Sequence, residues 1–171
     1  MNRIRASMVL ALFVPALRTL PAQTNSLSGA ASLPVGDFAS VAFPGFGLAL
    51  LSGTGVSVGQ LDIRADITFD RLGGKVAGSR FQYQSFGLSL VKEARSGFYW
   101  LAGWSLYNAS DQATIAGRTG TFNHSNGGVK GGLGVNFGLF QRAVFIEADY
   151  VKLFATAPAP IWVPLRFGFR F

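Results

Sequence analysis

The chain has 171 residues, of which 49% are hydrophobic, and carries a formal net charge of +7. This length suits one domain, and the mean hydropathy of +0.33 is high for a soluble domain of that size. The absence of cysteine excludes disulfides, thiolate metal sites, cysteine catalysis and a lipid-modified N-terminal cysteine.

The N-terminus has the three parts of an export signal. Arg3 and Arg5 give a basic start, residues 8–17 an apolar core and residues 20–23 a cleavage region. The apolar core is about half of the ~20 residues that a spanning helix needs. We therefore predict a Sec-type signal peptide over residues 1–23, with an uncleaved amphipathic anchor as the alternative.

The predicted mature chain, residues 24–171, is less basic than the full sequence. Without Arg3, Arg5 and Arg18, the basic count falls from 15 to 12 against 8 acids, so the net charge falls from +7 to +4. No basic cluster is interleaved with aromatic residues in the manner of a nucleic-acid module, and we expect no nucleic-acid partner.

Segments of alternating apolar and polar residues follow, separated by turn-forming residues. Strand side chains point to opposite faces in turn, so a period of two predicts strands. The first segment is assigned partly because bacterial single-chain barrels have an even number of strands. In chain order the predicted strands are 27–33, 44–51, 60–70, 80–91, 98–108, 128–139, 143–154 and 161–171.

Two segments define the pattern and its one irregularity. In 60–70, Leu61, Ile63 and three further apolar residues alternate with polar ones, which no amphipathic helix would produce. In 80–91, Phe81 and Tyr83 have the opposite parity to Phe86, which predicts a β-bulge near Ser85.

The connections fall into two groups when the C-terminus is placed on the periplasmic side. The predicted periplasmic connections are 53–59, 92–97 and 140–142. The predicted outer loops are 34–43, 71–79, 110–126 and 155–160, and they are longer on average, as in outer-membrane barrels.

This organisation resembles the eight-stranded outer-membrane barrel family of the OmpX and OmpA-barrel type. The resemblance depends on the export signal, a first hairpin loop within 33–38, the alternating strands and the terminal Phe171. It implies an all-β, eight-stranded antiparallel up-and-down transmembrane β-barrel in the outer membrane. It also implies an assembly signal read by the barrel-assembly machinery, carried by Leu165, Phe167, Phe169 and Phe171.

The alternation predicts a charged lumen. Buried charges must be paired or hydrated, so we expect a mutual ion-pair network that fills the interior of so narrow a barrel. A small gated ion channel through the network is the alternative. The expected lumen residues are Asp62, Arg64, Asp66, Lys130, Glu147, Asp149, Arg166 and Arg170.

No catalytic, cofactor or metal site is predicted. His124, the single histidine, lies beside Ser125 in a segment expected to be a loop, without the held geometry of a nucleophile and base. His124 and Asp111 alone offer too few ligands for a metal. A lipid-modifying enzyme remains the alternative that would need His124 or the lumen carboxylates.

The remaining side chains point to the membrane. The aromatic residues Trp100, Trp104, Tyr99, Tyr107, Tyr150 and Trp162 are expected in interfacial belts or in packing. Four bases in the outer loops, Arg71, Lys75, Arg80 and Arg118, are hypothesised to contact anionic lipid headgroups.

The sequence thus predicts a monomeric, non-enzymatic outer-membrane protein with a structural or surface-interaction role and outer-membrane lipid as its partner. A soluble ligand-binding barrel of lipocalin type is the competing fold, because it shows the same alternation with the two faces reversed.

Overall fold

Nearly all of the described chain is strand. The computed structural model describes residues 25–115, 118–139, 142–155 and 159–171, without the side chains of 113–115 and 118. The predicted signal peptide lies outside the described residues. The elements are β1 Asn25–Pro34, α2 Phe38–Val41, β2 Ala42–Val58, β3 Leu61–Gly74, β4 Arg80–Glu93, β5 Phe98–Ile115, β6 Arg118–Leu139, β7 Arg142–Leu153 and β8 Ile161–Arg170. Among these elements, no helix could cross a membrane by itself.

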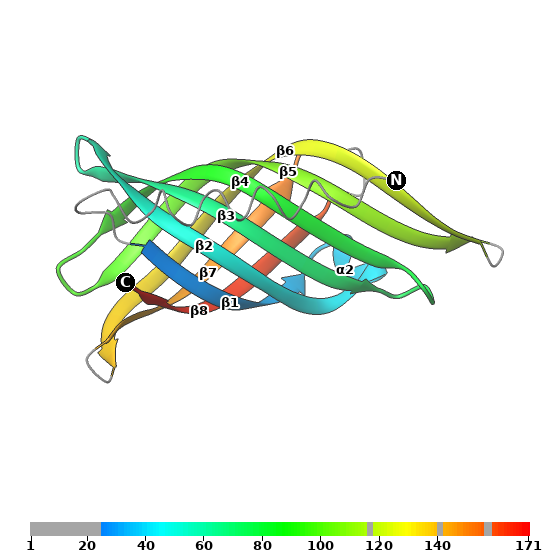
Figure 1. The fold of residues 1–171 in the computed structure, drawn as a ribbon, viewed down its shortest axis with the longest axis horizontal. Coiled ribbons are helices and arrows are strands. Elements are labelled where there is room, and N and C mark those ends of the chain that lie inside the picture. Colours follow the sequence, from blue (N-terminus) through cyan, green and yellow to red (C-terminus); the bar gives the residue numbers. More distant parts are fainter. Residues whose placement is uncertain (1–24, 116–117, 140–141, 156–158) are drawn as a thin grey trace.

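The strands form one closed antiparallel barrel. Each strand pairs with its neighbours in sequence, and β1 closes the ring on β8 through pairs such as Leu27 with Phe169 (Figure 1). Closure removes the exposed sheet edges that invite aggregation. The predicted fold class, an eight-stranded up-and-down barrel, is confirmed.

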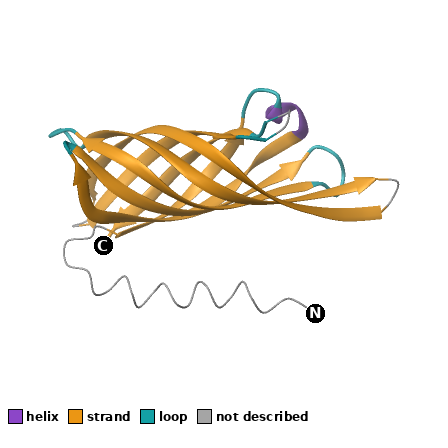
Figure 2. Ribbon diagram, turned by 90° about the horizontal axis from the view of Figure 1, so that it is seen from above, coloured by secondary structure: helices purple, strands orange, loops and turns teal. Residues whose placement is uncertain are grey.

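The two ends of the barrel differ. Asn25 and Phe171 pair at one end, here called the terminal end. At the opposite, distal end lie α2 and the hairpin in which β5 and β6 extend together beyond the other strands (Figure 2). That hairpin overturns one prediction: residues 110–115 and 118–126 are strand and not loop, since register continues from Ser110 with Asn123 to Ile115 with Arg118.

Two other local predictions were wrong. Strand β4 keeps continuous register with β3 and β5 past Ser85, so there is no β-bulge. Phe81 and Tyr83 differ in parity from Phe86 because they face the lumen, while Phe86 is 53% exposed on the outside. The predicted turn 53–59 is mostly strand, with a register shift between Gly53 and Ser57.

The exterior is an apolar belt. Large hydrophobic side chains around the whole barrel are between about a third and two thirds exposed; we call this set the apolar belt, and it includes Leu27, Leu48, Phe86, Trp104, Leu133, Ile146, Leu165 and Phe167. The buried face of the same strands carries charged and hydroxyl side chains. The lipocalin interpretation requires the reverse arrangement and is wrong.

Candidate functional site

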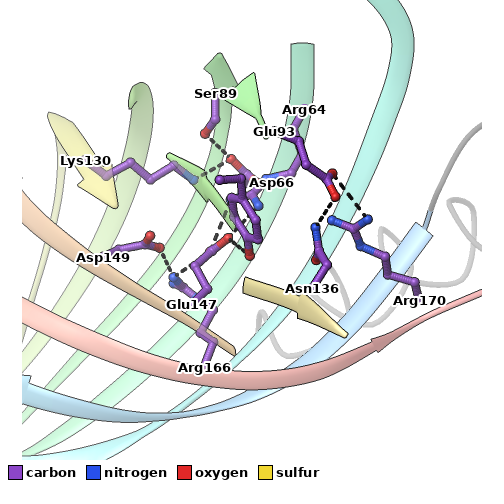
Figure 3. A network of polar contacts seen from close by, with 11 residues as sticks. Arg64, Asp66, Ser89, Glu93, Lys130, Asn136, Glu147, Asp149, Arg166 and Arg170 are labelled. Carbon is purple, nitrogen blue, oxygen red and sulfur yellow. Dashed lines mark hydrogen bonds and ion pairs between the residues drawn. The ribbon is translucent and has the colours of Figure 1, made fainter. Parts of the chain in front are cut away.

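Three acids and three bases meet in the terminal half of the lumen. They come from four strands: Arg64 and Asp66 from β3, Lys130 from β6, Glu147 and Asp149 from β7, and Arg166 from β8. All but Arg64 are buried, and its side chain is only 12% exposed. Figure 3 shows the six side chains converging on one another from opposite walls of the barrel. We call this set the charged layer.

Glu147 and Asp66 are the two centres of the charged layer. Glu147 accepts hydrogen bonds from Arg64 Nη1 at 2.6 Å, from the Tyr99 hydroxyl at 2.9 Å and, at 3.5 Å, from Arg166. Asp66 accepts from Arg64 Nε at 2.7 Å and also from Lys130 and Ser89. Arg64 therefore bridges the two carboxylates, and the layer has a formal charge of zero.

Arg166 completes the layer on the far side. Its guanidinium donates to Asp149, and its backbone pairs directly with that of Glu147. Burying a charge is costly unless it is paired and hydrogen-bonded, so each partner is needed by the others. These contacts join the six side chains into one network inside the barrel.

Two glycines of β6 make room for Asp149 of the charged layer and for Tyr99, a hydrogen-bond donor to that layer. A Cβ on Gly134 would overlap the ring of Tyr99, and one on Gly132 would overlap the carboxylate of Asp149. Gly138, in contrast, has nothing within 4 Å of such a Cβ. Larger residues at Gly132 and Gly134 would therefore collide with side chains of the lumen.

Two of the eight predicted lumen residues lie apart from the charged layer. Asp62 is exposed and accepts a hydrogen bond from Ser57, and Arg170 lies 3.7 Å from Glu93. Both line an open cavity of about 340 Å³ at the terminal mouth, whose walls include Arg64 and Tyr99. This water-accessible mouth ends at the charged layer.

Several polar side chains of the lumen were not predicted from the sequence. Ser89 and Tyr99 have the parity of lumen-facing residues. Ser89 was not predicted because an uncharged serine does not indicate an ion-pair network, and Tyr99 was predicted to lie with the other aromatic residues in a belt or in packing. Asp70 was also omitted, although it is 2% exposed and accepts a hydrogen bond from Ser32. Parity was the signal that could have identified all three.

The distal half of the lumen is filled by a different kind of side chain. Trp162 is fully buried, stacks on Tyr83 with ring centroids 4.8 Å apart and meets the edge of Tyr107 at 5.7 Å. Phe38 of α2 reaches inward onto Phe81 and Tyr83. We call this set the aromatic layer. The predicted belt residues therefore divide: Trp100, Trp104 and Tyr150 are exposed, whereas Tyr99, Tyr107 and Trp162 are in the lumen.

In the described part of the hairpin beyond the belt, His124 and Ser125 do not form a nucleophile and base pair. His124 lies opposite Ala109 and 3.7 Å from Asp111, while Ser125 donates to Asn108. Adjacent strand residues point to opposite faces, so His124 cannot activate Ser125. Burial raises the pKa of Asp111, and the charge of His124 partly opposes this shift.

Comparisons with known proteins agree with this geometry. No protein-family model matches the chain, and no curated protein has a matching sequence. Neisserial surface protein A is similar in structure at a TM-score of 0.60 and 15% identity, over 86% of this chain and 95% of that one.

This chain has the fold of an eight-stranded outer-membrane β-barrel protein. The attachment invasion locus protein Ail of Yersinia pestis is similar at a TM-score of 0.57 and 15% identity, over 87% of this chain and 97% of that one. The N-terminal barrel of Pseudomonas aeruginosa OprF gives 0.59 and 10%, over 86% and 97%. The resemblance predicted from the sequence is confirmed for the fold.

Proposed function

We propose that the protein is a monomeric, non-conducting barrel of the outer membrane that presents its distal hairpin and loops for surface interaction. The observation that carries this proposal is the double filling of the lumen, by the charged layer and by the aromatic layer. A barrel filled at two levels offers its surfaces, not its interior, for function.

Insertion in a membrane is supported by the apolar belt. The exposed side chains of the belt, such as Phe86, Leu106 and Phe167, are apolar. On β4 and β5 the next exposed side chains toward the distal end are polar, Gln84 and Asn108. An apolar band bordered by polar residues is the signature of a transmembrane barrel. The terminal end then faces the periplasm and the distal hairpin faces outward.

Two experiments test insertion and orientation. The natural chain has no cysteine, so single probes can be introduced as Asn123→Cys in the hairpin and Ser96→Cys at the terminal end. An impermeant maleimide should label the first on intact cells and the second only after the outer membrane is permeabilised. The reverse pattern contradicts the orientation, and a soluble periplasmic protein without heat-modifiable gel mobility contradicts insertion.

The small gated channel is the second candidate, because the terminal mouth brings water as far as Arg64. Planar-bilayer recording separates the two. The proposed barrel gives no reproducible unitary steps, whereas a gated channel gives steps that change when Glu147 or Arg166 is replaced.

The last strand is proposed to contact the barrel-assembly machinery during biogenesis. Leu165, Phe167, Phe169 and Phe171 all lie on the exterior, between 45% and 62% exposed, in one row along the closing seam. Phe171→Ser should slow the appearance of heat-modifiable protein in cells. It should leave the same variant able to refold into detergent, and a defect in refolding would instead assign Phe171 a packing role.

The protein is further proposed to be non-enzymatic. Membranes from cells with and without it should have the same lipid composition. A lipid change that disappears in His124→Gln or Glu147→Gln would establish the enzyme alternative.

A further inference from the structure

We propose that Arg71, Lys75 and Arg80 form a binding site for the phosphate of an anionic lipid headgroup on the outside of the barrel. This inference depends on the proposed membrane insertion and identifies one specific partner for the distal rim. The fourth base suggested by the sequence, Arg118, has a side chain outside the described residues.

Arg71 and Arg80 lie on the neighbouring strands β3 and β4 and line one groove, and Lys75 lies in the turn between these strands. Arg71 lies opposite Gln82 and Arg80 opposite Gly73, so the two arginines are diagonal neighbours across the β3 and β4 pair. Both have exterior parity, since Asp70 and Leu72 are buried and Phe81 packs into the lumen. Diagonal neighbours are within reach of long side chains, so both guanidinium groups can contact one anion.

No acidic side chain among the described residues forms an ion pair with these cations. In the described part of the chain, neither arginine forms an ion pair, and Lys75 has its Nζ 5.8 Å from the ring centroid of Phe43. Each base of the charged layer, in contrast, forms an ion pair with at least one buried acid. Three exterior cations without an acid repel one another, and binding an anion relieves that repulsion.

The surroundings define what kind of anion fits. A groove of about 430 Å³ lies between the two arginines, with Pro44, Gly45 and Gln112 among its walls. The guanidinium fork matches a phosphate in a bidentate manner, and the amide of Gln112 adds a neutral donor. A phosphate monoester carried on a larger molecule fits these donors.

The position relative to the belt makes that molecule a lipid. Phe69 lies two residues from Arg71 on the same face, and Phe46 lies directly opposite Arg71 with its ring 6.3 Å from that of Phe69. Leu48, 56% exposed, continues the apolar surface toward the middle of the barrel. A lipid with its phosphate at the arginines would therefore place its acyl chains along exposed aromatic and aliphatic side chains.

The test uses protein refolded in a neutral detergent, with lipid A as the probe. Lipid A is a phosphorylated, acylated glucosamine disaccharide, and its dephosphorylated form is the matched ligand. Native mass spectrometry measures bound lipid, and the temperature at which the gel band shifts measures stabilisation. We expect lipid A to bind the natural chain at least about tenfold more tightly than the dephosphorylated form, a difference of ~1.4 kcal/mol.

Arg71→Gln with Arg80→Gln should abolish that preference. The control, Arg95→Gln with Arg142→Gln, makes the same change of charge at exposed arginines of the terminal end and should retain it. Arg71→Lys with Arg80→Lys keeps the charge but removes the fork, and should give an intermediate loss. A compact band on unheated gels shows that each variant is folded, so a loss of binding is distinguishable from a failure of the barrel itself.

Three results would overturn the proposal. The first is unchanged lipid A binding by the glutamine double variant. The second is competition by inorganic phosphate at the same concentration as lipid A, which would make the site one for free phosphate. The third is binding of heparin to the same arginines more tightly than lipid A, which would assign the rim to a polyanionic glycan.

Discussion

The two halves of the lumen are filled according to opposite physical rules. The charged layer at the terminal end is built from reciprocal contacts, in which Glu147 alone serves Arg64, Tyr99 and Arg166. The aromatic layer at the distal end is built from ring packing around Trp162 and closed by Phe38. The same alternating strands support both layers. The alternation therefore determines which side chains face the lumen, while the residue types at each level determine whether that level is charged or aromatic.

We expect removal of a side chain from the charged layer to destabilise the barrel more than removal of one from the aromatic layer. Glu147→Ala removes the acid that Arg64 and Arg166 share, so the charged layer is left with three bases, two acids and a net charge of +1. Breaking a buried ion pair typically costs about 3–5 kcal/mol. Urea unfolding of the barrel in lipid vesicles, followed by gel mobility, measures the loss.

Glu147→Gln is the matched control for that experiment. It keeps the volume and an acceptor for Tyr99, so it separates the loss of charge from the loss of packing. An alanine variant within about 1 kcal/mol of the natural chain, the range of an exposed pair, would mean that water replaces the carboxylate and that the layer is hydrated.

Phe38→Ala tests the aromatic layer. The variant removes the ring that closes the distal end, but α2 can detach locally, so the cost should be at most ~3 kcal/mol, the lower end for a buried phenylalanine. The larger effect should be on access: in a Ser105→Cys background, a lumen thiol becomes reactive to a maleimide added from outside. Equal labelling with and without Phe38 would show that other side chains seal this end.

The fold was largely predictable from the sequence because a period of two survives along every strand. Seven of the strands and the inward direction of Asp66, Lys130, Glu147 and Arg166 follow from parity, while the first strand also needed the even strand number of bacterial barrels. The extent of the β5 and β6 hairpin did not follow, because Ser, Asn and Gly residues that usually form turns are paired there across a hairpin.

The depth of each residue along the barrel axis also could not be predicted from the sequence. Asp62 and Asp66 share one face, yet only Asp66 is deep enough to join the charged layer, since four residues of strand separate the mouth from the interior. Phe81 and Tyr83 suggested a bulge because an aromatic side chain was expected outside. Their inward position depends on a lumen that is apolar at one end only, which is a tertiary property.

Two glycine substitutions in β6 test how closely this strand packs against Tyr99 beside the charged layer. Gly134→Ala drives a methyl group into the ring of Tyr99, and overpacking of this kind costs about 1–3 kcal/mol. Gly138→Ala on the same strand meets nothing within 4 Å and should change stability by less than about 0.5 kcal/mol. Equal effects at both positions would mean that strand propensity, and not contact with Tyr99, determines the cost.

The smallest effect is expected where the charged layer meets water. Asp62 is exposed at the terminal mouth and has Ser57 as its hydrogen-bond partner, so Asp62→Asn should cost less than about 1 kcal/mol in the same urea assay. Removing the same charge four residues further in, by Asp66→Asn, should cost several times more, because Lys130 and Arg64 would lose a buried acid. A ratio near one between the two variants would place Asp66 in water as well. The lumen would then be open to water from the terminal mouth to the aromatic layer. Phe38 would be the remaining barrier to ion flow, and a planar-bilayer recording would test whether it prevents conductance.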